Sequence, residues 1–282
     1  MGAGYASQFT RNTAKVGELT ISYFKGGRGR PLLYLHGLGG WGRWESYHLA
    51  MGITNLVYAP QLPGWADGQI PPSVTSVSDY ARIMRQFLDT VEVNTVDLVG
   101  HSFGGWIALH MAVEHPQRVA KLVLVDAMGL DVPAVPAANL EAMPEEVFLR
   151  AAFAQTGKVV IRGDFGGVVE DVRQGQEFQK QWKGREIVAR LVRSQYADPE
   201  LTKKVNTITA DTLIVWGRED GVVPWRHGEV LAAAIPRARL TVIADAEHTP
   251  MREKRETFQR LVHNFLIGQE EGVERDGMVR HY

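Results

Sequence analysis

The chain has 282 residues, of which 45% are hydrophobic and 22% are charged. These fractions lie close to the averages of globular proteins and exclude a disordered tail protein, a collagen-like repeat and a coiled coil. Lysine and arginine number 31 against 32 aspartate and glutamate residues, so the formal net charge of -1 lacks the basic excess expected of a nucleic-acid binder. The cysteine count of 0 excludes disulfide scaffolds, thiolate metal sites and cysteine nucleophiles. A catalytic nucleophile must therefore be an oxygen atom.

The N-terminal residues lack the apolar core of a signal peptide. No apolar run approaches the roughly 18 residues that a membrane-spanning helix needs. We therefore expect a cytoplasmic protein whose partner is a small molecule, with neither a nucleic acid nor a membrane as partner. The sequence contains no indication of the oligomeric state.

Residues 15–25 alternate between apolar and polar side chains around Gly17, which predicts an antiparallel hairpin at a sheet edge. The chain then contains short, continuous apolar runs. Such runs are typical of strands that are buried on both faces, because helices cover both sides of a parallel sheet. The runs lie at residues 32–35, 56–59, 96–99, 121–125, 212–216 and 240–243.

Helical patterns lie between these runs. Ser76 and Asp79 offer a capping box before an apolar stripe over residues 80–91. Residues 106–113 are apolar nearly all round, which predicts a deeply packed helix, and residues 258–266 form an amphipathic stripe. Because strands and helices alternate and such crossovers are right-handed, the sequence predicts an α/β fold with a mostly parallel, doubly wound sheet.

The alternation of strands and helices is interrupted between about residue 130 and residue 206. A proline-rich stretch opens this interval, and helix-like stretches follow at residues 145–154, 177–191 and 198–205. We therefore predict an inserted helical subdomain. The last residues show no periodicity, which is typical of a flexible tail. The predicted units are a core of residues 1–130 and 207–267, an insert of residues 131–206 and a tail of residues 268–282.

The motif Gly100-His101-Ser102-Phe103-Gly104 lies between a buried strand and a packed helix. A turn this tight forces the central residue into strained backbone geometry, and the flanking glycines let the chain pass without clashes. The Ser102 hydroxyl is thereby placed at the start of a helix, whose amides and dipole favour developing negative charge. We interpret Ser102 as a nucleophile rather than as part of an ordinary glycine-rich turn.

A serine hydroxyl is a poor nucleophile unless a base accepts its proton. His248 follows the run at residues 240–243 and lies on a loop at the carboxyl edge of the sheet, where Ser102 also emerges. We interpret His248 as the base. For the other histidines near the predicted sheet, packing, capping or loop support is the expected role: His36, His101, His110 and His115.

The imidazole needs a carboxylate that holds its tautomer and stabilises the imidazolium. Asp220 follows the run at residues 212–216 and completes the order Ser, Asp, His that this motif requires. The adjacent Glu219 is longer and one position early. Asp126, at the end of another strand, is an alternative because its carboxylate could also reach the histidine. A helix cap or a turn is the competing interpretation of both aspartates.

Residues 34–40, YLHGLGG, again follow a strand. Their glycines allow the backbone to curl, so that amides point into the site, where an oxyanion intermediate needs preorganised donors. We predict that the backbone N–H groups of Leu38 and Phe103 form this oxyanion hole. A phosphate-binding loop is disfavoured, because no Lys-Ser or Lys-Thr pair follows the glycines.

The segments YLHGLGG, APQLPGWADG, VGHSFGGW, LVLVDAMG, WGREDGVVP and ADAEHTP occur in this order within residues 15–267 and resemble the α/β-hydrolase superfamily. The resemblance implies an eight-stranded sheet, a helical cap over the site, no cofactor or metal, and a triad of Ser102, Asp220 and His248. Gln61 stands where the family commonly has aspartate, which affects the support of a loop rather than the triad. A serine nucleophile argues against haloalkane dehalogenases and epoxide hydrolases.

We expect a serine hydrolase that cleaves a small or medium carboxylic ester, or a related acyl substrate, through an acyl-enzyme. The HGLGGWGRW segment also resembles meta-cleavage-product hydrolases, which cut carbon–carbon bonds. These usually have a tryptophan soon after the catalytic histidine, whereas residues 249–254 contain none. Carbon–carbon hydrolysis and a non-catalytic ligand receptor are the alternatives. The candidate walls of the substrate pocket, for which core packing is an equal explanation, are Trp41, Trp44, Phe148, Phe153, Phe165 and Trp182.

Overall fold

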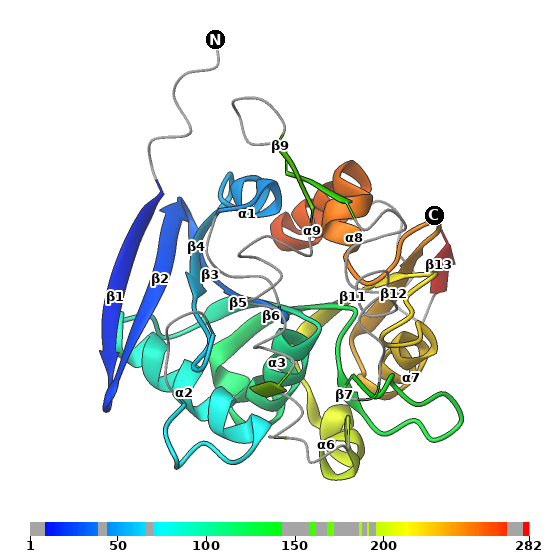
Figure 1. Cartoon of the computed structure of the whole chain (residues 1–282), viewed down its shortest axis with the longest axis horizontal. Coiled ribbons are helices and arrows are strands. Elements are labelled where there is room, and N and C mark those ends of the chain that lie inside the picture. Colours follow the sequence, from blue (N-terminus) through cyan, green and yellow to red (C-terminus); the bar gives the residue numbers. More distant parts are fainter. Residues whose placement is uncertain are drawn as a thin grey trace.

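The computed structural model describes residues 9–38, 44–65, 70–140, 142, 158–161, 168–171, 186–187, 191, 196–269 and 279–281. Within these residues a nine-stranded sheet has the order β1-β2-β4-β3-β5-β6-β11-β12-β13 (Figure 1). Its strands are β1 (Thr10–Val16), β2 (Leu19–Gly27), β3 (Arg30–Leu35), β4 (Asn55–Pro60), β5 (Val96–His101), β6 (Val119–Val125), β11 (Asp211–Gly217), β12 (Ala238–Ile243) and β13 (Val279–His281).

The sheet is antiparallel only at one edge, where β1 pairs with β2 and β2 pairs with β4. From β4 to β13 every neighbouring pair is parallel. The predicted hairpin is therefore confirmed, and each predicted apolar run lies inside one strand. The eight strands from β1 to β12 in this sheet agree with the expected α/β-hydrolase architecture.

The ninth strand, β13, lies within residues 268–282, which are predicted from the sequence to form a flexible tail. Val279 pairs with Leu240 of β12 in parallel register, so residues 279–281 extend the sheet. An edge strand presents unpaired backbone groups that another segment can satisfy. Three residues are too few for a period of two to be visible in the sequence. Residues 270–278 lie outside the described residues.

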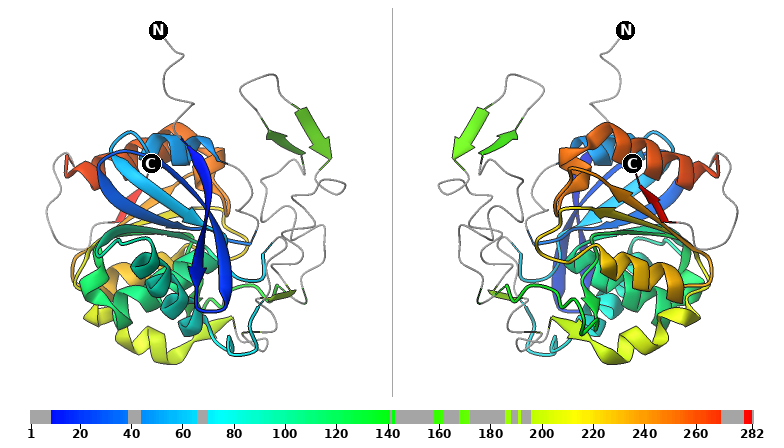
Figure 2. Two further views of the ribbon diagram at one scale, coloured as in Figure 1. Left: turned by 90° about the vertical axis from the view of Figure 1, so that its left-hand side faces the viewer. Right: turned by 90° about the vertical axis from the view of Figure 1, so that its right-hand side faces the viewer.

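Helices cover both faces of the sheet (Figure 2). On one face lie α2 (Val77–Thr90), α3 (Phe103–Glu114) and α7 (Arg226–Ala234), whose apolar residues join one core cluster. On the other face lie α1 (Ser46–Met51) and α9 (Arg255–Ile267), which belong to a second cluster. Because both faces are covered, the central strands contain continuous apolar runs.

The start of α2 confirms the predicted capping box. The Asp79 N–H donates to Ser76 Oγ at 3.3 Å, and the Ser76 N–H donates to Asp79 Oδ2 at 3.1 Å. The apolar stripe that follows, from Tyr80 to Leu88, is buried against the sheet. The capping box thus marks where this helix begins. The apolar residues, which repeat with a period of 3.6 residues, mark the face that it buries.

The insert between residues 131 and 206 is not purely helical in its described part. The helix α6 (Pro199–Lys204) confirms the predicted helical stretch at residues 198–205, and Asp198 caps it by accepting from the Leu201 N–H at 2.8 Å. The strands β8 (Lys158–Ile161) and β9 (Val168–Asp171) form an antiparallel hairpin, and β7 (Gly129–Leu130) pairs with β10 (Ala197–Asp198).

The β8–β9 hairpin is a pair of strands within the insert, for which the sequence predicted helical stretches alone. Its two strands are rich in valine, which favours strands over helices, so a local signal was present. The predicted helix at residues 145–154 lies outside the described residues, and of the one at residues 177–191 only residues 186, 187 and 191 are described, all helical. In the part of the chain that the structure describes, no helix has the length and hydropathy needed to cross a membrane.

Candidate active site

Ser102 occupies the turn between β5, which ends at His101, and α3, which begins at Phe103. Its backbone has φ 54° and ψ -116°, a strained conformation for a residue other than glycine. Hydrogen bonds hold it there: the Ser102 N–H donates to Val125 O at 2.9 Å, and Ser102 O accepts from the N–H of Trp106 and of Met128, each at 3.1 Å. The predicted strained turn is therefore present.

The flanking glycines allow α3 to approach the sheet closely. A Cβ atom at Gly104 would lie 2.2 Å from the carbonyl oxygen of Leu35 on β3. A Cβ atom at Gly100 would lie 2.5 Å from the carbonyl oxygen of Gly104. Since real Cβ contacts are never this short, a larger side chain at either position would force α3 away from β3 and β5 and displace Ser102.

His248 lies on the loop between β12 and α8 (Pro250–Glu253). Its Nε2 is 2.8 Å from Ser102 Oγ, and its Nδ1 is 2.9 Å from Asp220 Oδ2. In the neutral imidazole, Nδ1–H donates to the aspartate and Nε2 accepts from the serine hydroxyl, which is the tautomer that a general base requires. The exposed fractions are 1% for Ser102, 8% for Asp220 and 6% for His248. This hydrogen-bonded relay of three side chains is therefore shielded from water.

The backbone around His248 is fixed by two side chains, the half-buried Glu253 and the buried His101. Glu253 on α8 accepts from the N–H of Glu247 and from both the N–H and the hydroxyl of Thr249, at 2.6 to 3.0 Å. His101 Nε2 lies 2.8 Å from the carbonyl oxygen of His248. Burial, and then the neighbouring His248, hold the pKa of His101 well below its ordinary value. His101 is therefore neutral, and its Nε2–H donates to this carbonyl.

The two adjacent acidic residues after β11 have different roles. Asp220 Oδ1 accepts from the N–H groups of Val222 and Val223 at 2.7 and 3.0 Å, which aims Oδ2 at His248. Glu219 Oε2 instead accepts from the Ala246 N–H at 3.1 Å and ties the loop after β11 to the loop that carries His248. Of this pair, Asp220 is the residue that contacts the imidazole.

Asp126, the alternative carboxylate, lies at the end of β6 and is fully buried. Its N–H donates to Val215 O at 3.1 Å, and its Oδ1 accepts from the Gly217 N–H at 2.8 Å. The side chain contacts Asp220, and the hydrogen bond to His248 is made by Asp220. Burial, and then the charge of Asp220, raise the pKa of Asp126 well above its ordinary value.

The loop after β3 holds its amides in a defined direction. Burial lowers the pKa of His36 to about 4, so its ring is neutral. His36 Nε2 accepts from the Leu62 N–H at 3.1 Å, and its Nδ1–H therefore donates to Gly37 O at 2.6 Å. In a trans peptide the C=O and N–H groups point in opposite directions, so the Leu38 N–H points away from His36.

This loop lies directly against the nucleophile. A Cβ atom at Gly37 would be 3.0 Å from Ser102 Cβ, and Leu38 O accepts from Trp65 Nε1 at 2.6 Å. Phe103 is the first residue of α3, so its N–H has no acceptor within the helix. The predicted pair of donors, Leu38 and Phe103, thus comes from two segments that meet at Ser102.

Two residues support this loop, and one of them, Trp65, was not predicted to do so. Trp65 stacks on Phe103, with ring centroids 5.5 Å apart, and donates to the carbonyl of Leu38. Gln61 Nε2 donates to the carbonyl oxygen of Trp65, which agrees with the expected role of this position in loop support. The APQLPGW segment was visible in the sequence, but its contact with residues 36–38 arises only through the pairing of β3 with β4.

Trp44 does not behave as the predicted pocket wall. Its ring packs against Phe9, Phe24 and His48, with centroids 4.2, 5.9 and 4.8 Å away, on the face covered by α1 and α9. The reason is its place two positions before the first residue of α1, which directs it to that face. The other predicted wall residues lie outside the described residues: Trp41, Phe148, Phe153, Phe165 and Trp182.

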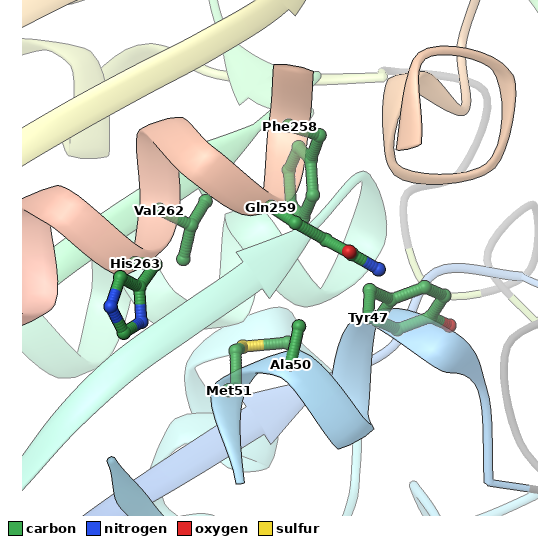
Figure 3. A pocket seen from close by; sticks show the side chains of 7 residues that line it. All are labelled: Tyr47, Ala50, Met51, Phe258, Gln259, Val262 and His263. Carbon is green, nitrogen blue, oxygen red and sulfur yellow. The ribbon is translucent and has the colours of Figure 1, made fainter. Parts of the chain in front are cut away.

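A separate small hollow lies between α1 and α9 (Figure 3). Neither Ser102, Asp220 nor His248 lines it, and its lining contains no aspartate, glutamate, lysine or arginine. It is therefore a packing defect between two helices rather than an extension of the site. Its lining residues are Tyr47, Ala50, Met51, Phe258, Gln259, Val262 and His263.

Comparison with known proteins finds similarity to hydrolases over most of the chain. The sequence model described as "Alpha/beta hydrolase family" matches residues 32–260. A 2-hydroxy-6-oxo-6-phenylhexa-2,4-dienoate hydrolase from Comamonas testosteroni is 29% identical, over 93% of this chain and 97% of its own length. A 2-hydroxymuconate semialdehyde hydrolase from Pseudomonas sp. (strain CF600) is 28% identical, over 85% of this chain and 88% of its own length.

Among solved structures, a meta-cleavage product hydrolase from Pseudomonas fluorescens IP01 has the same fold. The TM-score is 0.75, with 23% sequence identity over 92% of this chain and 98% of that chain. At this level of identity the likeness concerns the fold.

Proposed function

The chain belongs to the alpha/beta hydrolase family, and we propose that it is a serine hydrolase that cleaves a carbon–carbon bond in a 2-hydroxy-6-oxo-dienoate. The observation that carries the proposal is the hydrogen-bonded relay of Ser102, His248 and Asp220. Two relatives that match over most of their length, each named as a hydrolase of such a compound or of a muconate semialdehyde, support this class of substrate over a plain ester.

The proposed first step is attack of Ser102 Oγ on the ketone carbonyl of the substrate. His248 Nε2 takes the hydroxyl proton, and Asp220 stabilises the imidazolium that forms. The carbonyl oxygen becomes an oxyanion, which the N–H groups of Leu38 and Phe103 stabilise. The strained turn at Ser102 and the neutral His36 hold these groups in place before the substrate binds.

The second step distinguishes this substrate from an ester. In the keto tautomer of a 2-hydroxy-6-oxo-dienoate, which forms when the 2-hydroxyl proton moves to the carbon next to the ketone, the bond beside the ketone joins it to a saturated carbon. This carbon is attached to a C=C bond that is conjugated with a second carbonyl. When the tetrahedral intermediate collapses, the bond beside the ketone breaks and its electron pair is delocalised as a dienolate, which takes the proton from His248. Water, activated by the same imidazole, then hydrolyses the acyl-enzyme and releases the carboxylic acid.

Ester hydrolysis is the second candidate, and it was the primary expectation from the sequence. The same residues would act in the same order, except that His248 would protonate an alkoxide. The observation in its favour is the segment Thr249–Lys254, which lacks the tryptophan expected of the carbon–carbon hydrolases.

A substrate panel tests the proposal. We expect a dienoate substrate with a 6-oxo group to be consumed with a kcat/KM at least about tenfold above that of any ester in a series of graded acyl length, a difference of about 1.4 kcal/mol in transition-state binding. The Ser102→Ala variant serves as the blank. A higher kcat/KM for an ester would overturn carbon–carbon hydrolysis in favour of the second candidate. Binding of the dienoate without turnover would indicate a receptor.

The pH dependence of the reaction tests the base. We expect kcat/KM to rise as the pH increases between about 5 and 8, because His248 accepts the serine proton only when its ring is neutral. The measurement is a pH series with the preferred substrate, accompanied by circular dichroism at each pH to confirm that the protein stays folded. A flat profile across this interval would contradict the assignment of His248.

A further inference from the structure

Asp126 and Asp220 form a pair of buried carboxyl groups at the ends of neighbouring strands. Asp126 is 0% exposed and Asp220 is 8% exposed. Asp220 has three donors, the N–H groups of Val222 and Val223 and the Nδ1–H of His248. Among the residues that the structure describes, the donor to Asp126 is the Gly217 N–H, which bonds to Oδ1. The carboxyl with three donors is the one whose negative charge is stabilised.

The surroundings of the second carboxyl oxygen of Asp126 indicate that one of the two aspartates carries a proton. Among the described residues Asp126 Oδ2 is buried and meets no donor, and the carboxyl group of Asp126 contacts the side chain of Asp220. Two ionised carboxylates in buried contact repel each other, and neither offers a hydrogen. If one of them is protonated, the same contact is a hydrogen bond. The charge of Glu253, which also acts on Asp126, is negative and favours the protonated form.

We propose that Asp126 is a positioning residue, protonated in the folded protein, whose hydroxyl hydrogen donates to Asp220 and holds that carboxylate against His248. The proposal rests on the proposed function, because it assigns Asp126 a role in orienting the same triad. The proton stays on Asp126 throughout the reaction. Asp126 therefore contributes a fourth donor to Asp220 while adding no second negative charge beside the imidazole.

The first test compares Asp126→Asn with Asp126→Ala. Asparagine has the same shape, accepts from Gly217 through its oxygen, donates to Asp220 through its amide and cannot ionise. We expect Asp126→Asn to keep kcat within about threefold, whereas Asp126→Ala lowers kcat about 10- to 100-fold with little change in KM, since a hydrogen bond to a charged group is lost. Unchanged kcat in Asp126→Ala, or an equal loss in both variants, would overturn the positioning role.

The pH profile of Asp126→Asn separates a protonated Asp126 from an ionised one. If Asp126 is neutral in the wild type, its replacement by a neutral amide leaves the midpoint of the acidic limb of kcat/KM unchanged. If Asp126 is an anion, the replacement removes a negative charge that stabilises the imidazolium, and the midpoint moves to lower pH by about one unit. The second result would overturn the proposal. The other charged groups facing this position, Asp220, Glu253 and His248, are the same in both proteins.

A stability measurement tests the proton without using activity. The pKa of Asp126 is raised in the folded protein, whereas an unfolded aspartate ionises near pH 3.9, so above that pH folding takes up a proton and wild-type stability falls as the pH rises. Asp126→Asn lacks this effect. We expect the Tm of Asp126→Asn minus that of the wild type to increase from about pH 5 to pH 8. A constant difference would contradict the proposal.

The experiments distinguish a failure of the proposed function from a failure of the role proposed for Asp126. If Ser102→Ala retains turnover, the proposed function fails, although the rising Tm difference still reports a protonated Asp126. If Ser102→Ala is inactive but the acidic limb of Asp126→Asn moves to lower pH, the serine mechanism stands and the role of Asp126 is overturned.

Discussion

Ser102→Ala is expected to lower kcat by about 10^4- to 10^6-fold, the range found when the nucleophile of a comparable triad is removed. The methyl group offers no oxygen to attack the carbonyl, whereas the amides of Leu38 and Phe103 remain available to bind the substrate. KM should therefore change little. The fold should persist, since alanine experiences about the same backbone strain as serine at φ 54°. The measurement is steady-state turnover of the preferred substrate together with Tm.

Ser78→Ala is the matched control for this variant. Ser78 lies on α2, and its hydroxyl donates to Glu114 Oε2 at 3.0 Å, at the opposite end of α3 from Ser102. We expect its activity to equal that of the wild type. Retention of more than about a tenth of wild-type kcat in Ser102→Ala would show that bond cleavage proceeds without this nucleophile.

Asp220→Asn is expected to lower kcat by about 10^3- to 10^4-fold. Its amide can donate to His248 Nδ1, which favours the tautomer with the proton on Nε2, and that proton then faces Ser102 Oγ. The ring can no longer accept the serine proton, and the carboxylate charge that stabilises the imidazolium is also lost. Binding of the substrate should be largely retained, so the loss should appear in kcat. Steady-state kinetics at a fixed pH measure it.

Glu219→Gln controls for disturbance of the loop after β11. Its amide oxygen can still accept from the Ala246 N–H, the contact that Glu219 makes, so near-normal activity is expected. Asp126→Asn completes the comparison. If Asp220→Asn were nearly as active as the wild type while Asp126→Asn were inactive, the carboxylate that orients His248 would be Asp126.

The substrate class depends on elements beyond the relay. The same three side chains serve ester and carbon–carbon cleavage, because both proceed through an oxyanion and differ only in the group that departs. Whether an ester or a carbon–carbon bond is cleaved depends on the stability of that departing group. It also depends on the pocket walls that select the substrate. The substrate panel tests this specificity directly. Five of the predicted wall residues lie outside the described residues: Trp41, Phe148, Phe153, Phe165 and Trp182.

The sequence by itself determined the features that depend on local physical chemistry. Continuous apolar runs marked the parallel strands, Ser76 and Asp79 marked the start of α2, and the glycines around Ser102 marked a turn that few other residues allow. The chain order of serine, aspartate and histidine was also sufficient to select Asp220 and His248. Each of these signals operates over a few residues, where sterics and hydrogen bonding leave little choice.

Only the tertiary structure decided which groups meet. Ser102 and His248 are separated by 146 positions, and their 2.8 Å contact arises because β5, β6, β11 and β12 are parallel neighbours whose carboxyl ends share one edge. The same edge brings Asp126 against Asp220, while the position of Trp44 before α1 turns its ring to the opposite face. Contacts of this kind depend on the register of strands and the packing of helices. A pattern of residues along the chain does not encode them locally, because their energy is gained only when distant segments assemble.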